Sequence, residues 1–146
     1  MDIGASIGSW KYTDDATGTY RDSDGTDESY GYAIKDTKVG DMPQFGLNFG
    51  LTALPVDGAA LQLTYRYYDL FFADWSPTSR SFSSESDADR NQPFRIPSYR
   101  LVDLNASYDL PFEFNGATAK LVLNVRNLLD EVYIQDALDN SRYNAN

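Results

Sequence analysis

The chain reads Phe45-Gly46-Leu47-Asn48-Phe49-Gly50-Leu51-Thr52-Ala53, a stretch that alternates strictly between apolar residues and small or polar ones. A period of two places successive side chains on opposite faces of an extended chain, so this stretch predicts a β-strand with one apolar and one polar face. Strands of membrane β-barrels need this pattern, because lipid surrounds the barrel and water or polar groups fill it.

Three further stretches repeat the alternation, around residues 61–67, 102–110 and 121–125. Polar side chains such as Gln62 and Asn124 lie between the apolar ones. If the strands belong to a membrane barrel, the apolar residues face lipid. The residues predicted to face the membrane are Phe45, Leu47, Phe49, Leu51, Leu61, Leu63, Tyr65, Tyr67, Val102, Leu104, Tyr108, Leu121, Leu123 and Val125.

We expect β-strands over residues 2–12, 43–54, 60–72, 99–110 and 118–127. In the first strand the alternation changes phase, because Ile7 occupies an odd position whereas Trp10 and Tyr12 occupy even ones. A β-bulge near Ser9 would restore the phase.

Short and long connections alternate between the expected strands. Pro55-Val56-Asp57-Gly58 and the segment 111–117, which contains Asn115-Gly116, predict tight turns at one end of a meander. The long connections leave from the other end and span residues 13–42, 73–97 and 130–146. We expect residues 13–32 to be loop and residues 30–38 to include a short extended piece. This asymmetry is typical of outer-membrane barrels, so the predicted fold is all-β, an antiparallel up-and-down meander that forms part of a transmembrane β-barrel.

Aromatic residues gather toward the ends of the strands that lead into the long connections. Such a cluster is typical of the aromatic girdle of a membrane barrel. The residues concerned are Tyr65, Tyr67, Tyr68, Phe71, Phe72, Trp75 and Tyr99.

The composition restricts the possible chemistry. The chain has no Cys and no His, which excludes thiolate metal sites and a His-dependent catalytic triad. Its net charge of −10 argues against a nucleic-acid partner. We therefore expect no catalytic residue, no cofactor and no metal ion.

Periodicity alone fits a soluble β-sandwich or a small soluble barrel as well as it fits a membrane barrel. Gly8-Ser9-Trp10 resembles the Gly-x-Trp of lipocalins, which would make the chain a small-ligand-binding module. The start of the chain, Met1-Asp2-Ile3-Gly4, lacks the basic start and apolar core of a secretion signal. The chain is accordingly expected to be either a soluble protein or a piece of a longer one.

Two short motifs suggest other functions. Gly4-Ala5-Ser6-Ile7-Gly8 has the spacing of a G-x-S-x-G nucleophile elbow, which would make Ser6 a nucleophile. An elbow needs a turn from a strand into a helix and a His partner, whereas this segment is predicted to be a strand and the chain has no His. The alternative is a set of small residues on the inner face of a strand. Asp22, Asp24 and Asp27, and in a second segment Asp87, Asp89 and Asn91, have the oxygen-rich spacing of a calcium loop. The alternative for both acidic segments is a solvated loop tip.

The most specific stretch is Leu121-Val122-Leu123-Asn124-Val125-Arg126-Asn127-Leu128-Leu129-Asp130-Glu131-Val132-Tyr133. It resembles the penultimate strand of TonB-dependent outer-membrane receptors and the Asn-Leu-(Phe/Leu)-Asp-x-x-Tyr corner that follows it. Ser98 to Tyr108 is similar to the preceding strand of that family. Residues 39–44, residues 65–68 followed by 73–75, and residues 136–144 resemble segments of Bacteroidetes-type receptors.

The resemblance implies a receptor in the outer membrane of a Gram-negative cell. Such receptors have a barrel of about 22 strands and a plug in its lumen. They import a scarce solute, such as an iron-siderophore, vitamin B12 or a glycan, with energy supplied through TonB. The implied partners are outer-membrane lipid, the rest of the barrel with its plug, and TonB only through an N-terminal part of the receptor.

The chain departs from the complete family pattern. It lacks a plug, a TonB box and the final barrel strand, so we expect residues 1–146 to be a C-terminal portion of the barrel with about five strands. The long loops 13–42 and 73–97 are the segments expected to touch the solute, because long loops carry binding residues.

Overall fold

The computed structural model describes residues 1–139, apart from the side chains of residues 20, 77, 78 and 114. The C-terminal part of the resemblance to Bacteroidetes-type receptors, from residue 140 onward, lies outside the described residues. The chain divides into two compact units. We call the first the sheet unit, made of Met1–Ile7, Phe45–Asp69 and Ser98–Tyr133. We call the second the loop unit, made of Gly8–Gln44, Leu70–Pro97 and the segment from Ile134 onward.

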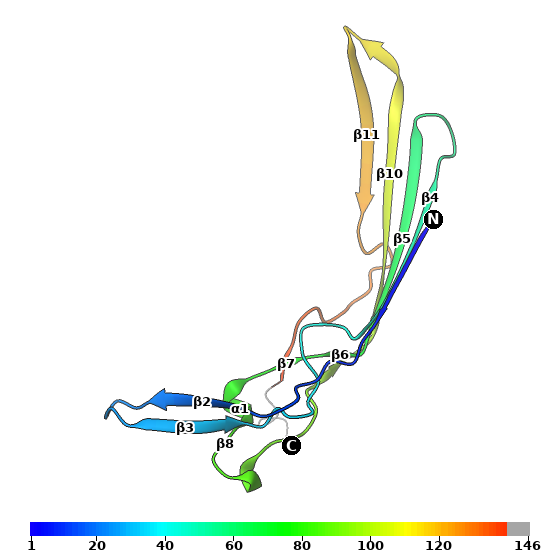
Figure 1. The fold of residues 1–146 in the computed structure, drawn as a ribbon. Coiled ribbons are helices and arrows are strands. Elements are labelled where there is room, and N and C mark those ends of the chain that lie inside the picture. Colours follow the sequence, from blue (N-terminus) through cyan, green and yellow to red (C-terminus); the bar gives the residue numbers. More distant parts are fainter. Residues whose placement is uncertain (140–146) are drawn as a thin grey trace. The chain divides into compact units, whose positions relative to one another are not determined.

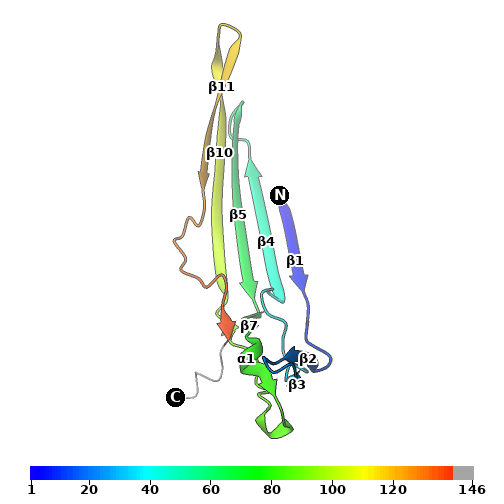
Figure 2. The same cartoon turned by 90° about the vertical axis from the view of Figure 1, so that its left-hand side faces the viewer.

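The sheet unit is one antiparallel sheet of five strands, in the order β1-β4-β5-β10-β11 (Figure 2). Its strands are β1 (Asp2–Ile7), β4 (Phe45–Ala53), β5 (Ala59–Asp69), β10 (Tyr99–Phe114) and β11 (Ala117–Val125). This confirms the all-β, antiparallel, up-and-down fold. Within the described residues the sheet does not close, because β1 and β11 form its two edges.

Two tight turns lie at the same end of the sheet, between β4 and β5 and between β10 and β11 (Figure 1). Gly58 has φ +78°, and Asn115 and Gly116 have φ +49° and +77°. Glycine and asparagine tolerate this left-handed region better than other residues, which explains the Asp-Gly and Asn-Gly pairs in the sequence. The long connections leave from the opposite end of the strands, as expected.

Several strand limits differ from the expected ones. β1 ends at Ile7 rather than at residue 12, so the change of phase marks the end of the strand and not a bulge. β5 ends at Asp69, because Leu70 has φ +51°, which breaks the extended backbone before Phe71. β10 continues past the expected turn to Phe114.

The extension of β10 runs through Pro111, and the turn itself is limited to Asn115 and Gly116. The pairing of β10 with β11 shifts register between Asp109 and Glu113. Proline cannot donate a backbone hydrogen bond, so it is accommodated where the ladder is irregular.

The loop unit contains more regular structure than expected. Residues 13–32 were predicted to be loop, but they form a hairpin of β2 (Ala16–Arg21) and β3 (Asp27–Tyr32), and β3 also pairs with β8 (Ser81–Phe82). The extended piece ends at Tyr32, not at residue 38. The segment 73–97 is likewise not a plain loop. Its elements and their pairing partners are β6 (Phe71–Phe72) with β9 (Arg95–Ile96), β7 (Asp74–Trp75) with the parallel β12 (Leu138–Asp139), α1 (Pro77–Arg80) and η1 (Glu85–Asp87).

A small apolar core holds the loop unit together. Its buried apolar residues are Ala33, Ile34, Phe71, Phe72, Ala73 and Ile96. Gly40 passes so close to this core that a Cβ atom there would lie 2.6 Å from the carbonyl oxygen of Ala73. Any side chain at residue 40 would push the two segments apart, so this position requires glycine.

Candidate functional site

The strand register places every residue predicted to face the membrane on one face of the sheet unit. Leu51 of β4 lies opposite Leu63 of β5, which lies opposite Leu104 of β10, which in turn lies opposite Val125 of β11. Directly opposite residues point to the same face of a sheet, and every second residue along each strand joins them. We call this set the apolar face: Phe45, Leu47, Phe49, Leu51, Leu61, Leu63, Tyr65, Tyr67, Val102, Leu104, Tyr108, Leu121, Leu123 and Val125.

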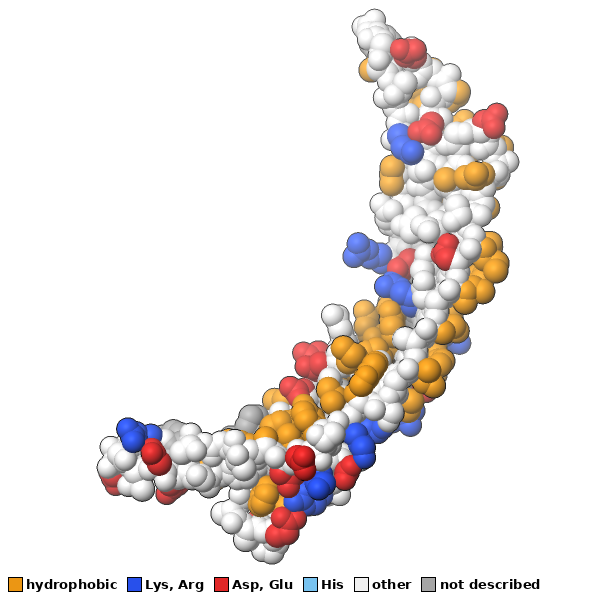
Figure 3. All heavy atoms as spheres, viewed as in Figure 1, with side chains coloured by type: hydrophobic (Ala, Val, Ile, Leu, Met, Phe, Trp, Pro, Cys, Tyr) orange, Lys and Arg blue, Asp and Glu red, His pale blue; other side chains and the backbone are white. Residues whose placement is uncertain are grey.

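The apolar face is exposed in the sheet unit by itself. Leu121 is 59% exposed and Leu123 is 55% exposed. Hydrophobic side chains run along one side of these strands in Figure 3. β1 continues the face, because Ile3 lies opposite Phe49. Among the described residues of this unit, no second sheet layer covers these side chains, so the unit is not a β-sandwich.

The opposite face of the sheet is polar. A row of Thr52, Gln62, Asn105 and Asn124 crosses four strands. We call the residues on this side the polar face. Val122 is an exception, being apolar and 62% exposed.

An ion pair anchors the polar face near the end of the sheet that leads into the long connections. The guanidinium of Arg66 on β5 donates to the carboxylate of Asp103 on β10. The same carboxylate accepts the backbone N–H of Asn127 at 3.0 Å. Asp103 therefore links the sheet to the segment that follows β11.

Asn127 forms a tight corner at the end of β11. Its side-chain amide donates to the carbonyl oxygen of Glu131 and accepts the backbone N–H of Glu131, both at 3.0 Å. Asn127 has φ +51° and Asp130 has φ +52°. Asn and Asp are the non-glycine residues that best tolerate this region, which gives the Asn-Leu-Leu-Asp motif a structural reason.

A tyrosine stack follows this corner. Tyr133 stacks on Tyr99 with ring centroids 4.6 Å apart, and Tyr99 contacts Tyr68 at 5.3 Å. Tyr68 lies opposite Tyr99 and shares the polar face with it. Tyr68 and Tyr99 therefore do not lie on the apolar face, and the predicted girdle is wrong for them.

Other predicted girdle residues belong to the loop unit. Phe71 and Phe72 are buried in its core, at 5% and 9% exposure. Trp75 donates from its indole nitrogen to the hydroxyl of Tyr12 at 3.3 Å. Of the predicted girdle, Tyr65 and Tyr67 are the members that lie on the apolar face, because residues alternate along β5.

The proposed serine nucleophile is contradicted by its backbone. Ser6 lies inside β1, opposite Gly46 on β4. A nucleophile elbow requires a sharp turn from a strand into a helix, and the described chain continues from Ile7 into the loop unit without a helix there.

A buried arginine occupies the interior of the second calcium-like segment. Arg80, at the end of α1, is 1% exposed, and its Nη1 donates to the carbonyl oxygens of Asp89 at 2.9 Å and Asn91 at 2.6 Å. Nη2 lies 3.9 Å from the carboxylate of Asp139. Backbone carbonyls of this kind are ligands of Ca²⁺ in calcium loops, and here they face a guanidinium instead.

The first calcium-like segment is the turn of the β2–β3 hairpin. Asp22 accepts the backbone N–H of Ser23 at 2.6 Å on its side chain, and its carbonyl oxygen accepts the N–H of Gly25 at 2.9 Å. Asp27 pairs with Arg21 at 2.9 Å. Among residues 1–139, no group of three or more carboxylate side chains is placed to hold a metal ion.

A second ion-pair cluster ties the hairpin segment to the segment after β8. Arg90 pairs with Asp15 at 2.9 Å and with Glu85 at 2.6 Å. Asp15 also accepts the backbone N–H groups of Ile34 and Lys35 at 3.0 and 2.8 Å. The Arg90 guanidinium is the main cause that lowers the pKa of Asp15 to about 2.

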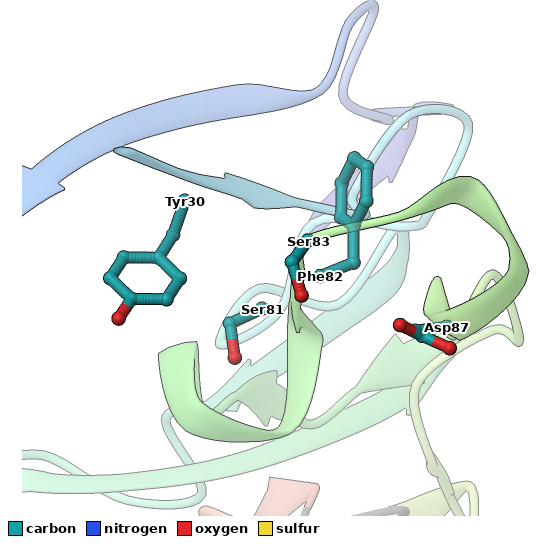
Figure 4. A pocket seen from close by; sticks show the side chains of 5 residues that line it. All are labelled: Tyr30, Ser81, Phe82, Ser83 and Asp87. Carbon is teal, nitrogen blue, oxygen red and sulfur yellow. The ribbon is translucent and has the colours of Figure 1, made fainter. Parts of the chain in front are cut away.

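The loop unit also carries a cavity of about 480 Å³, lined by Tyr30, Ser81, Phe82, Ser83 and Asp87 (Figure 4). Its size lies within the range of small-ligand pockets. Sequence reasoning missed this cavity because its lining comes from two segments about fifty residues apart, β3 and the segment 81–87. It falls within the loops expected to touch the solute.

Comparison with known proteins identifies the family. The family model described as TonB dependent receptor-like, β-barrel, matches residues 1–128 of the sequence. This range contains all five strands of the sheet unit. No curated protein and no solved structure gives a significant match. In the described part of the chain, no helix has the length and apolar character needed to cross a membrane. The chain belongs to the TonB-dependent receptor β-barrel family, whose members are transport receptors of the outer membrane and not a family of enzymes.

Proposed function

We propose that this chain forms part of the barrel wall of a receptor that imports a scarce solute with energy supplied through TonB. Residues 1–146 would be a C-terminal portion of the barrel that precedes the last strand, with the plug and the contact to TonB in an N-terminal part of the receptor. The solute classes we propose are an iron-siderophore, a vitamin or a glycan. The observation that carries the proposal is a five-stranded sheet with one mainly apolar face, interrupted by Asp69 and Arg100 at the end that leads into the long connections, and one mainly polar face.

The apolar face would contact outer-membrane lipid. Leucine side chains that are 37–59% exposed, such as Leu63 and Leu121, are unfavourable in water at this density on one surface. Contact with the hydrocarbon of the membrane removes the free-energy cost of exposing these side chains to water. The hydrogen bonds between the strands satisfy the backbone N–H and C=O groups, which find no water partner in lipid. The polar face would then line the lumen.

The loop unit would meet the solute outside the membrane. In this family architecture short turns lie on the periplasmic side and long connections lie outside the cell. The turns at Gly58 and at Asn115-Gly116 would therefore be periplasmic. Residues 13–42 and 73–97 would reach the solute first.

Single-cysteine variants test the orientation of the sheet. Residues 1–146 contain no cysteine, so labelling of each variant is compared with that of the receptor without an introduced cysteine. In the receptor embedded in outer membrane, Leu63→Cys should resist a water-soluble maleimide, whereas the neighbouring Thr64→Cys should react with it once the membrane is permeabilised. The reverse pattern would contradict a lipid-facing apolar face.

An uptake assay tests the transport function. Cells that carry the receptor are offered a panel of ferric siderophores, cobalamin and oligosaccharides. We expect accumulation of one panel member that requires the receptor and stops when a protonophore removes the proton gradient. Receptor-dependent uptake that continues without the gradient would contradict the role of TonB, and no uptake of any member would contradict the proposed solute classes.

A further inference from the structure

We propose that the cavity lined by Tyr30, Ser81, Phe82, Ser83 and Asp87 binds a positively charged organic group of the solute, such as an alkylammonium. The inference rests on the proposed function, because it assigns a chemistry to the solute that the loop unit would meet. To the proposed transport function, the inference adds a binding site in the loop unit and a positive charge on the group of the solute that binds there.

The lining combines aromatic rings with a carboxylate. In Figure 4 the hydroxyl groups of Ser81 and Ser83 lie between the Tyr30 ring on one side and the Asp87 carboxylate on the other. An organic cation is attracted by the face of an aromatic ring and by a carboxylate, whereas a neutral group gains only dispersion and hydrogen bonds there.

The carboxylate of Asp87 is fixed in place at the rim of the cavity. The hydroxyl of Ser84 donates to one of its oxygens at 2.8 Å, and the hydroxyl of Ser86 donates to the other at 3.4 Å. The backbone N–H of Asp87 donates to the carbonyl oxygen of Ser84 at 2.9 Å. An anchored carboxylate loses little side-chain freedom when it binds a cation.

A second carboxylate lies beside the aromatic wall. The hydroxyl of Tyr30 donates to the carboxylate of Glu28 two residues earlier on β3. This hydrogen bond polarises the phenol and adds a negative charge near the same side of the cavity. Among the described residues that line the cavity, none is cationic.

Arg90, whose guanidinium lies over the Phe82 ring, does not reverse this charge balance. Its guanidinium carbon lies 5.8 Å from the ring centroid. Two carboxylates, Asp15 and Glu85, pair with that one guanidinium. The cluster therefore keeps a net negative charge, and its own guanidinium already occupies one position over the Phe82 ring.

The test uses choline as the probe and dimethylbutanol, in which a carbon atom replaces the choline nitrogen, as its neutral analogue. The receptor is held in detergent micelles, and ring signals of Tyr30 and Phe82 are followed by NMR during titration. We expect saturable binding of choline, and binding of dimethylbutanol weaker by at least twofold. Equal binding of the two probes, or no binding of choline, would overturn the proposal.

Two variants and a matched control locate the site. Asp87→Asn keeps the shape of the side chain but removes its charge and replaces one of its two acceptor oxygens by an NH2 group, and it should weaken choline binding by about two- to fivefold, as expected for an exposed ion pair. Tyr30→Leu should weaken it to a similar extent through loss of the cation–π contact. Asp24→Asn makes the same charge change at the hairpin turn and should leave choline binding unchanged. If Asp24→Asn weakens choline binding as much as Asp87→Asn, the effect is one of overall charge and the site is refuted.

The outcome is separate from that of the transport assay. Uptake of a neutral or anionic solute by the receptor would leave the transport function intact and would refute a cation site that serves it. If the receptor takes up no member of the panel but still binds choline, the transport function is refuted and the cation site is not.

Discussion

The carboxylate of Asp103 and the backbone N–H of Asn127 are joined by a hydrogen bond of 3.0 Å, which fastens the corner after β11 to β10 of the sheet unit. The same carboxylate pairs with Arg66. One residue further, the N–H of Leu128 donates to the carbonyl oxygen of Val102 at 2.7 Å. The corner is thus held by side chain and backbone together, and the Tyr133–Tyr99 stack follows from that attachment.

The first prediction concerns the Asn127 side chain. Asn127→Ala removes both hydrogen bonds to Glu131. It also places alanine at φ +51°, a backbone conformation that asparagine tolerates better than alanine because its side chain forms local hydrogen bonds. We expect a loss of about 1–3 kcal/mol in the free energy of opening of this corner. Amide hydrogen exchange at residue 131, measured in detergent micelles, should become faster.

Asn127→Gly separates the two causes. Glycine tolerates the positive φ but cannot form the side-chain hydrogen bonds. Exchange at residue 131 in this variant should be intermediate between wild type and Asn127→Ala. Equal exchange in all three proteins would show that the corner is held by Asp103 and the backbone alone.

The second prediction tests the two faces of β5 with the same substitution. Leu63→Arg puts a charge on the apolar face, and Thr64→Arg puts it one residue further on the polar face. An arginine facing lipid near the middle of a barrel costs about 2–4 kcal/mol, whereas one facing the lumen costs little. Urea titration in lipid vesicles should show that loss for Leu63→Arg and no comparable loss for Thr64→Arg. Similar losses at both positions would contradict the lipid-facing assignment.

The sequence could predict the sheet unit because its strands alternate. Around Phe49 and Leu63, apolar and polar residues exchange at every step, and this pattern determines both the strand and its faces. The hairpin of β2 and β3 was missed for the opposite reason. Ala16–Arg21 and Asp27–Tyr32 do not alternate between apolar and polar residues, so their sequences do not predict strands. Backbone pairing and a few contacts, such as that of Gly31 with Phe82, hold β2 and β3 instead.

The contacts of the site could not be predicted for other reasons. The guanidinium of Arg80 donates to backbone carbonyl oxygens. Because any residue type supplies such an oxygen, the sequence does not indicate these partners. Tyr133 meets Tyr99 only because the corner at Asn127 turns the chain back. The break after β5 depends on a positive φ at Leu70, which no property of leucine favours.

The third prediction concerns the buried arginine. Arg80→Met leaves the carbonyl oxygens of Asp89 and Asn91 without their donor and the buried carboxylate of Asp139 without its cation. Breaking a buried pair in this way costs roughly 3–5 kcal/mol. Both tryptophans lie in the loop unit, so urea unfolding followed by tryptophan fluorescence reports this loss.

Arg80→Lys is the matched control. It keeps the charge, but its single ammonium cannot replace both Nη1, which donates to the two carbonyl oxygens, and Nη2, which lies beside the Asp139 carboxylate. Some stability should therefore be lost, but less than in Arg80→Met. Unchanged unfolding in Arg80→Met would show that the loop unit does not depend on this guanidinium.

The fourth prediction follows from the low pKa of Asp15, about 2. A carboxyl whose pKa is lower in the folded protein than its ordinary value of 3.8 stabilises the fold above 3.8, and this contribution is lost as the pH falls toward 2. The melting temperature of the loop unit, followed by tryptophan fluorescence, should therefore fall between pH 4 and pH 2. In Asp15→Asn that part of the fall should be absent, and the stability at neutral pH should be lower. An unchanged acid profile in the variant would contradict the role of the Asp15–Arg90 pair.

The last prediction has the opposite sign. Burial raises the pKa of Asp41, and the carboxylates of Asp136 and Asp74 raise it further. The folded protein therefore binds a proton at Asp41 more tightly than the unfolded chain does, and this contribution is present at low pH and lost as the pH rises through the raised pKa.

Asp41→Asn removes this charge while keeping the backbone, because Asn tolerates the φ of +59° at this position. The N–H of residue 41 can still donate to the carbonyl oxygen of Phe72, a bond of 3.1 Å. At neutral pH we expect the variant to melt at a higher temperature than the wild type, and the difference should shrink on mild acidification. Asp24→Asn, which changes the net charge equally, should show no such gain. A lower melting temperature for Asp41→Asn at neutral pH would contradict the repulsion inferred from the positions of the three carboxylates.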